Sequence, residues 1–318
     1  MEGRSAKPKR KKRKWVKIIG VISLLLLIGV GGYGYSVYKA LTDTVDTMHE
    51  PIEREVSEKR VEDLTLKDKE PFSVLMLGVD EREGDRGRSD TMIVLTVNPT
   101  LQSVKMLSIP RDTRTEIIGR ETEDKINHAY AFGGVKMSME TVENFLDIPI
   151  DFYLQVNMEG FEDIVDAVGG VTVDNDLDFT IEGIHFPKRE ITLDGEKALL
   201  YTRMRYEDPR GDFGRQLRQR QIIEAVIKEG ASLSSLTNYK NIFNALGENI
   251  RTNLTFNEMI DIQKNYKDAA KEMEQLTITG EGTRIHSIYY LIVSDEEKET
   301  IQKALKEHLE IVESKKNP

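Results

Sequence analysis

Six arginines fall within the eighteen residues RMRYEDPRGDFGRQLRQR, between Arg203 and Arg220, against three acidic residues. The rest of the chain beyond its basic N-terminal tail is strongly acidic, so this segment concentrates fixed positive charge locally. A guanidinium group stays charged at any working pH and binds phosphate oxygens through paired N–H donors. The segment therefore predicts a site for a phosphate-containing ligand.

Two further loops carry residue types that suit phosphate chemistry. Residues 78–90 read GVDEREGDRGRSD, with Asp80 and Asp90 near the two ends and three arginines between them, and SIPRD supplies Arg111. Mg²⁺ binds one or two carboxylates and completes its shell with water and phosphate oxygens. Asp90 directly precedes a predicted strand, so it is the better placed metal ligand. A merely solvated charged loop is the alternative, and the loop taken alone favours it.

A helix predicted to begin at Asp212 and end near Glu229 would have one two-part face. Residues at i, i+4, i+7 and i+11 share a stripe, here Arg215, Gln219, Ile222 and Val226. The stripe changes along the helix axis from phosphate-binding to aliphatic side chains. It suits a ligand with a charged head and a hydrocarbon tail, with Ile222 and Val226 lining the tail. An ordinary amphipathic helix is the alternative, but it does not explain the density of arginine.

The N-terminus has the pattern of an uncleaved membrane anchor. Residues 1–17 carry nine Lys or Arg and one Glu, and residues 18–38 are 21 uncharged residues. Such a run can cross a hydrocarbon core of ~30 Å, and the basic flank keeps the tail cytoplasmic. A cleaved signal peptide would have a shorter apolar core and an A-x-A-like site. We predict a single-pass type II cell-membrane protein with a tail (1–17), a transmembrane signal anchor (18–38), a stalk (39–70) and an extracellular catalytic domain (71–318).

Charge and residue usage exclude several other classes. The tail's +8 subtracted from the whole chain's −10 leaves −18 on residues 18–318, a field that repels nucleic acid. There is no cysteine, so disulfides and thiolate metal sites are excluded. The five histidines lack metal-ligand spacing, and no G-x-S-x-G motif supports a serine hydrolase.

Hydrophobic patterning predicts strands interleaved with helices. Apolar, β-rich runs predict strands at 72–80, 91–98, 103–110, 151–157, 171–175 and, as a central strand, 287–293. Helical spacing predicts helices at 133–146, 158–168, 212–229 and after Ser294. Asp194, Thr255 and Ser294 are predicted helix caps, the last two within S/T-x-x-E boxes. The fold class is α/β, an α-β-α-like sandwich with a central mixed sheet flanked by helices.

In order along the chain, these segments resemble the LytR-CpsA-Psr family of membrane-anchored cell-wall glycopolymer transferases. The motifs that carry the resemblance are GVDER, RSDTMIVLTVNP, SIPRDT, DKINHAYAFGG, YTRMR and GDFGRQLRQRQ. They extend from the anchor to about Lys228, and beyond residue 230 the match is weaker. One departure is Arg220, where many relatives have glutamine.

The resemblance implies transfer of an anionic polymer, typically wall teichoic acid, from an undecaprenyl-pyrophosphate carrier to peptidoglycan at the membrane lipid surface. It implies Mg²⁺, or Mn²⁺, on Asp90 and Asp80, with Asp80, Asp90 and Arg111 catalytic. The implied pyrophosphate-binding residues are Arg82, Arg88, Arg111, Lys125, Arg203, Arg205, Arg215, Arg218 and Gln219. Phosphoryl transfer rests mainly on positioning and charge neutralisation, which these residue types supply. Asp80 is the candidate base for the acceptor hydroxyl, with a metal-binding or arginine-orienting role as the alternative.

Two other hypotheses about the function use the same residues. A non-catalytic, membrane-anchored regulator would bind lipid carriers or envelope polyanions without transferring anything. A polyprenyl pyrophosphatase would use water in place of the glycan acceptor.

Overall fold

The computed structural model describes residues 35–36, 38–39, 42–52, 57, 59–60, 63–80, 87–232 and 249–311. Its centre is a six-stranded mixed sheet in the order β11-β6-β1-β2-β3-β12. Neighbours β1 and β6, and β3 and β12, run parallel, and the other pairs are antiparallel. The strands are β1 (Phe72–Val79), β2 (Ser89–Asn98), β3 (Ser103–Ile109), β6 (Phe152–Val156), β11 (Ile250–Thr252) and β12 (Glu272–Thr277).

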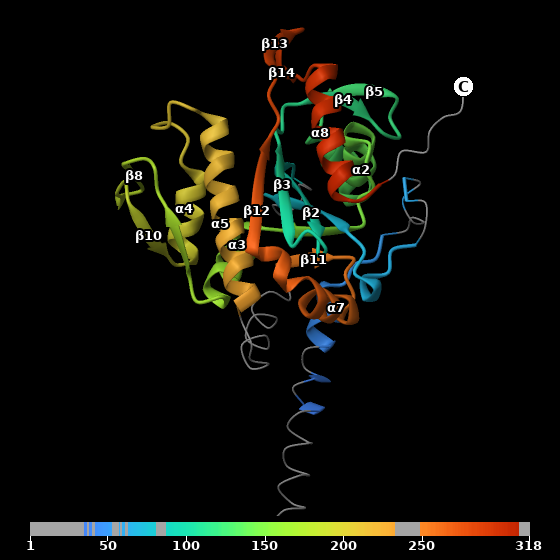
Figure 1. Cartoon of the computed structure of the whole chain (residues 1–318). Helices are drawn as coiled ribbons and strands as arrows, with labels where there is room; N and C mark the ends of the chain where they lie inside the picture. Colours follow the sequence, from blue (N-terminus) through green and yellow to red (C-terminus); the bar gives the residue numbers. More distant parts are fainter. Residues whose placement is uncertain are drawn as a thin grey trace, which may run out of the picture.

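Helices cover both faces of this sheet (Figure 1). Helices α2 (His128–Leu146) and α8 (Asp295–His308) lie on one face and α5 (Asp212–Ser232) lies on the other. Because strand side chains alternate between faces, Leu75 packs in the core with α2 and α8, whereas Met76 packs with Ile223 of α5. The predicted α/β fold with a central mixed sheet and flanking helices is confirmed.

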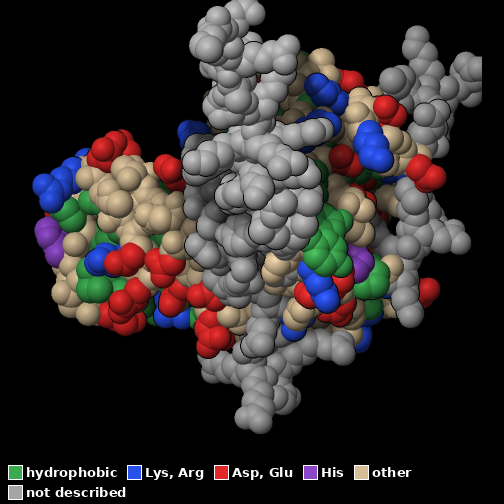
Figure 2. All heavy atoms as spheres, turned by 90° about the horizontal axis from the view of Figure 1, so that it is seen from below, with side chains coloured by type: hydrophobic (Ala, Val, Ile, Leu, Met, Phe, Trp, Pro, Cys, Tyr) green, Lys and Arg blue, Asp and Glu red, His purple; other side chains and the backbone are tan. Residues whose placement is uncertain are grey.

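A smaller layer packs on the outer side of α5. It contains α3 (Met158–Ala167), α4 (Gly195–Arg203) and two hairpins, β7 (Val171–Asp174) with β10 (Glu190–Leu193) and β8 (Phe179–Ile181) with β9 (Ile184–Phe186). Its core is separate from that of the main sheet and includes Phe179, Phe186 and Tyr201. Seen from below, this layer shows acidic and basic side chains side by side on its surface (Figure 2).

A strand is present within 287–293, but its predicted central position is wrong. β14 (Ile288–Ile292) pairs with β13 (Glu281–Ile285) in a two-stranded hairpin, and Ile288 and Tyr289 are exposed. The hairpin lies near a second one, β4 (Arg114–Ile117) with β5 (Thr122–Lys125), at the upper end of the molecule (Figure 1). The edge of the central sheet beside β3 is instead formed by β12, whose polar side chains suit an edge strand. At the other end lie α7 (Phe256–Tyr266) and the short helices η1 (Leu66–Asp68) and η2 (Lys267–Lys271).

The three predicted helix caps are confirmed, but of the two predicted capping boxes the one at Ser294 does not form. Asp194 accepts from the backbone N–H of Lys197, and Thr255 forms a complete capping box with Glu258. Ser294 accepts from Glu297, but the Glu297 side chain accepts from the Thr279 N–H instead of returning to the cap. Helix α2 begins five residues earlier than predicted, since a short helical segment from His128 precedes the predicted helix and joins it across a kink at Gly133 and Gly134.

The described parts of the segment predicted to be a stalk fold against the domain. Val45 and Met48 are buried, and Met48 packs with Ile250. The guanidinium of Arg60 pairs with the carboxylate of Asp151 at 2.7 Å. The predicted span 18–38 lies outside the described residues apart from positions 35, 36 and 38. Within the described ranges, no helix is both long and apolar enough to span a bilayer.

Candidate active site

A cavity of about 290 Å³ opens between the sheet, α4 and α5, at the carboxyl ends of β1 and β6. Ligand sites in α/β sheets commonly lie at such strand ends. One part of its wall is apolar and consists of Val79, Val156, Met158, Phe161, Leu199 and Ile223. The other part is charged and polar.

The strand ends leave room for this cavity. Gly78 on β1 pairs with Thr91 on β2, and the register shifts between Gly78 and Val79. A Cβ added at Gly78 would come within 2.9 Å of the Thr91 Cβ, so a side chain here would displace Thr91. The bulge re-aims the chain at Val79 and Asp80, as bulges beside active sites often do.

The end of α4 and the helix α5 bring together four of the predicted pyrophosphate-binding residues. Arg203 ends α4 and Arg205 follows it, while Arg215 and Gln219 lie one turn apart on α5. All four line the cavity. The Nε2 of Gln219 donates to the Thr91 Oγ1 at 2.9 Å, which fastens α5 to the sheet beside the cavity. The polar half of the helix stripe, Arg215 and Gln219, therefore lies at the cavity.

Arg215 is a buried cation whose polar contacts do not satisfy all of its guanidinium nitrogens. Its side chain is 10% exposed and pairs with Asp212 at 2.6 Å, while its Nε is buried without a hydrogen-bond partner in the described structure. Burial lowers the pKa of this guanidinium, and the nearby charges of Arg111 and Arg205 lower it further against the attraction of Asp212. An anion bound in the cavity beside this guanidinium would offset the cost of burying its charge, so this geometry favours an anionic ligand.

Asp80 and Asp90 line the same cavity. The Arg111 Nη1 donates to the Asp90 Oδ1 at 2.9 Å. Burial alone would lower the pKa of Arg111, but Asp90, Asp212 and Asp112 together raise it. Among the residues that the structure describes, no group of three potential metal ligands occurs. Two carboxylates beside a cavity lined by arginines nevertheless fit Mg²⁺, which completes its shell with water and phosphate oxygens.

Lys125, Arg88 and Arg82, the remaining predicted basic residues, do not line the described part of the cavity. The Lys125 Nζ pairs with the Asp112 Oδ1 at 2.6 Å, and Asp112 also lies 3.7 Å from the Arg111 Nε. Arg88 is exposed directly before β2. Arg82 lies outside the described residues.

Three predicted residues lie elsewhere. Arg218 is 1% exposed and its guanidinium binds Asp208 and two backbone carbonyls, so it does not line the cavity. Ile222 is fully buried in the core of the small layer, and Val226 packs against that core. The cavity is lined by Ile223 instead, one residue further around α5. Helical spacing identified the correct helix, but it could not show which side would meet the small layer.

The chain belongs to the LytR_cpsA_psr family, whose model matches residues 35–307. The resemblance drawn from the sequence motifs is thereby confirmed, and the chain is a transferase like its named relatives. A polyisoprenyl-teichoic acid–peptidoglycan teichoic acid transferase TagU of Halalkalibacterium halodurans is 56% identical over 283 residues, covering 88% of this chain and 93% of the relative.

Solved structures agree with this assignment. The crystal structure of TagU from B. subtilis is 50% identical, with a TM-score of 0.63, and covers 79% of this chain and 100% of that one. A structure described as TagT bound to LIIa-WTA is 33% identical, with a TM-score of 0.71, and covers 83% of this chain and 100% of that one.

Proposed function

We propose that this protein transfers wall teichoic acid from an undecaprenyl-pyrophosphate-linked precursor to peptidoglycan. The observation that carries the proposal is the convergence of Arg203, Arg205 and Arg215 with two carboxylates in one cavity whose other wall is apolar. The names of the related TagU transferases and the TagT structures bound to LIIa-WTA and LI-WTA support the same substrate class.

The two-part wall suits a ligand that is itself two-part. Arginines bind phosphate oxygens bidentately, and pairing with them offsets the burial of their charge. Phe161, Leu199 and Ile223 offer an apolar surface that favours a prenyl chain over water. A free nucleotide or sugar phosphate would leave this apolar wall unused.

In the proposed reaction an acceptor hydroxyl oxygen of peptidoglycan, the muramic acid 6-hydroxyl, attacks the phosphorus bonded to the polymer. A new P–O bond forms to the acceptor, the phosphoanhydride bond breaks, and prenyl monophosphate leaves with the bonding electron pair. The hydroxyl proton passes to a base, for which Asp80 is our candidate because it lines the cavity. The arginines stabilise the charge on the phosphate oxygens and hold the group for in-line attack.

Asp90 is the residue that would hold a divalent cation, Mg²⁺ or Mn²⁺, and Asp80 would be a second ligand in the alternative in which it is not the base. When bound, the cation would neutralise phosphate charge and polarise the P–O bonds. The Arg111–Asp90 ion pair (2.9 Å) occupies one carboxylate oxygen and fixes the direction of the other. Asp90 is thereby oriented before any ligand enters.

We also propose that residues 18–38 anchor the protein, with the domain outside the cell. An anchored domain meets both substrates, since the lipid-linked precursor lies in the membrane and peptidoglycan lies outside it. The nine basic residues of the tail favour a cytoplasmic N-terminus. Protease added to intact protoplasts should digest the domain and spare the tail, whereas protection beyond Lys39 would contradict this orientation.

The reaction itself separates transferase, pyrophosphatase and regulator. The full chain is incubated with Mg²⁺, prenyl-pyrophosphate-linked polymer and peptidoglycan strands, and the products are identified by mass spectrometry. We expect polymer joined to glycan and an equal amount of prenyl monophosphate. Prenyl monophosphate and free polymer phosphate, without attachment to glycan, would identify a pyrophosphatase, and retention of intact precursor would identify a binding regulator.

A further inference from the structure

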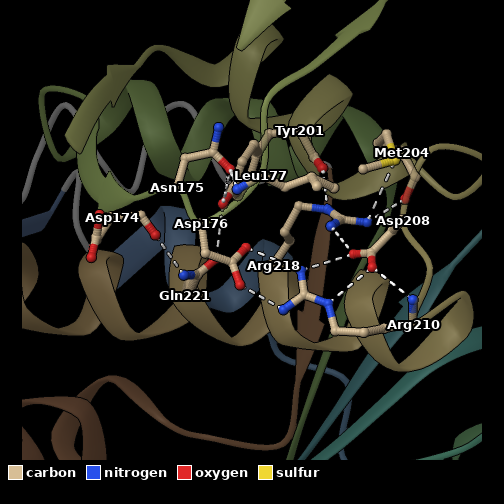
Figure 3. A network of polar contacts seen from close by, with 10 residues as sticks. All are labelled: Asp174, Asn175, Asp176, Leu177, Tyr201, Met204, Asp208, Arg210, Arg218 and Gln221. Carbon is tan, nitrogen blue, oxygen red and sulfur yellow. Dashed lines mark hydrogen bonds and ion pairs between the residues drawn. The ribbon is translucent and has the colours of Figure 1, made fainter. Parts of the chain in front are cut away.

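A buried network of polar side chains lies beside the cavity, where the end of α4 meets the first turns of α5 (Figure 3). At its centre the Arg218 Nη1 and the Asp208 Oδ2 lie 2.6 Å apart, with side chains that are 1% and 0% exposed. Burying two charges costs solvation that their attraction need not recover. A buried pair of this kind is therefore weak evidence for a gain in stability, and its other contacts indicate a second role.

Arg218 uses all three guanidinium nitrogens. Besides the bond to Asp208, its Nε donates to the carbonyl of Tyr201 at 3.1 Å and its Nη2 to the carbonyl of Met204 at 2.6 Å. These carbonyls belong to the C-terminal turn of α4, where intrahelical donors are lacking and positive charge is favourable. Arg203 lies between Tyr201 and Met204 in sequence, and Arg205 follows. The two carbonyl bonds thus hold the backbone that carries both cavity arginines.

Asp208 ties the same connection to α5. A Cβ built on Gly214 of α5 would lie only 1.9 Å from the Asp208 Oδ2, so only glycine permits this approach. The backbone N–H and Nε of Arg210 both donate to Asp208 at 2.9 Å, and Arg210 also pairs with Asp176 of the small layer at 2.6 Å. Burial alone would raise the pKa of Asp208, but hydrogen bonds from Arg210 and Arg218 hold it well below its ordinary value.

A second set of bonds in Figure 3 closes the network. The Tyr201 hydroxyl donates to the Gln221 Oε1 at 2.9 Å, and the Gln221 Nε2 donates to the Asp174 carbonyl at 2.9 Å. Both bonds connect α5 to the small layer. The two helices that supply the cavity's basic groups are therefore fastened to each other on the side away from the sheet.

We propose that the Arg218–Asp208 pair is a positioning element that presets the pyrophosphate-binding arginines. It holds Arg203 and Arg205 on the α4 side at a fixed distance from Arg215 and Gln219 on α5. Neither member of the pair lines the cavity, so both act through other residues. The inference rests on the pyrophosphate head group of the proposed function. Groups fixed before binding lose less freedom when the ligand arrives, which raises affinity.

Arg218→Lys tests this role because lysine retains the positive charge but lacks the several N–H donors of the planar guanidinium. A single ammonium group cannot reach Asp208, Tyr201 and Met204 in the planar geometry of a guanidinium. The matched control is Arg60→Lys, since Arg60 also forms a buried fork, with Asp151 and the Pro71 carbonyl, at the opposite ends of β1 and β6. Melting curves of both full-length variants establish the temperature at which each is folded.

Affinity for inorganic pyrophosphate is then measured by calorimetry in the presence of Mg²⁺. Arg218→Lys should raise the Kd about tenfold, since small misplacements of binding groups are costly, whereas Arg60→Lys should leave it unchanged. Equal losses in the two variants, or no loss in Arg218→Lys, would overturn the proposal. Asp208→Asn, which keeps the side-chain shape, should weaken binding in the same direction and serves if the lysine variant does not fold.

A double-mutant cycle shows whether Arg218 acts through the α4 arginines. In a background of Arg203→Ala with Arg205→Ala, the lysine change at Arg218 should cost no further affinity. In an Arg111→Ala background its full effect should remain. A full effect of Arg218→Lys in both backgrounds would overturn the positioning role of Arg218 and leave the proposed function standing. Failure of the wild-type chain to bind pyrophosphate, or no effect of Arg203→Ala, would overturn the proposed function and this inference with it.

Discussion

Arg111 and Asp90 form an ion pair at the polar end of the cavity, with 2.9 Å between the Nη1 and the Oδ1. The pair joins the loop after β3 to the start of β2. It also gives Asp90 one oxygen directed to a guanidinium and one that remains for a cation or a phosphate-bound water. The Asp90 carboxylate thus connects Arg111 to the proposed metal position.

Replacing Asp90 tests that link. Asp90→Asn keeps the shape, removes the charge that would hold Mg²⁺, and leaves Arg111 without its ion pair. Transfer should fall by roughly 10²–10³, in the range typical of losing one electrostatic group in an active site. Thermal stability should change little, because the Asp90 side chain is 46% exposed. The measurement is polymer attached to glycan per unit time at saturating Mg²⁺.

The matched control is Asp178→Asn, which removes an exposed carboxylate paired with His185 in the small layer. Its transfer rate should equal that of the wild type. Full activity of Asp90→Asn, or wild-type turnover in excess chelator, would show that residues 78–90 are merely a solvated loop.

Adjacent isoleucines on α5 should have separable roles. Ile223 lines the cavity, so Ile223→Trp should obstruct the prenyl chain and weaken long-chain substrates more than a short-chain analogue. Each methylene kept from an apolar surface costs up to ~0.8 kcal/mol, so the loss should grow with chain length. The measurement is the Kd for a series of prenyl pyrophosphates of increasing length.

Ile222 is the comparison, because it is fully buried in the core of the small layer. Ile222→Ala should lower the free energy of unfolding by about 2–5 kcal/mol and should not discriminate between chain lengths. Equal losses for long and short substrates in a folded Ile223→Trp protein would mean that the tail binds elsewhere.

His308 should make stability fall in mild acid. It is 2% exposed, and its ring lies between the hydroxyls of Thr96 (2.7 Å) and Ser103 (2.9 Å). Burial, assisted by Lys105, lowers the pKa of His308 from 6.5 to about 4. As pH falls from 6.5 to 4, the unfolded chain gains a proton here that the folded chain does not. The free energy of unfolding should therefore fall, by at most about 3 kcal/mol.

Denaturant titrations at several pH values measure this slope. His308→Gln should flatten it between pH 6.5 and 4, since glutamine does not titrate. An unchanged slope in His308→Gln would assign the acid sensitivity to other groups.

Local pattern predicted those elements whose burial is uniform or whose ends carry a specific cap. The strands at β1, β2 and β3 are apolar over most of their length, and Asp194 and Thr255 cap their helices through short-range bonds. β12 escaped detection because an edge strand can be polar. The run 287–293 has the composition of a central strand, yet it forms a hairpin because another segment occupies the sheet edge beside β3.

The site was predictable to the level of residue type but not of side-chain direction. Arg215 and Gln219 share a stripe in any helix, and both line the cavity. Arg218 is chemically equivalent in sequence, but Asp208, ten residues earlier, folds back and binds it. Ile223 lines the cavity where Ile222 was predicted to, for the same reason. The small layer covers one side of α5, and no local pattern specifies that contact.

A crystal structure of the full chain with a short-chain prenyl pyrophosphate and Mg²⁺ would show whether this cavity is the active site. We expect the phosphates between Arg203, Arg205 and Arg215, the cation on Asp90, and the prenyl chain against Ile223. A pyrophosphate bound outside this cavity would contradict the proposed function, and so would a prenyl chain inserted beside Ile222 in the small layer.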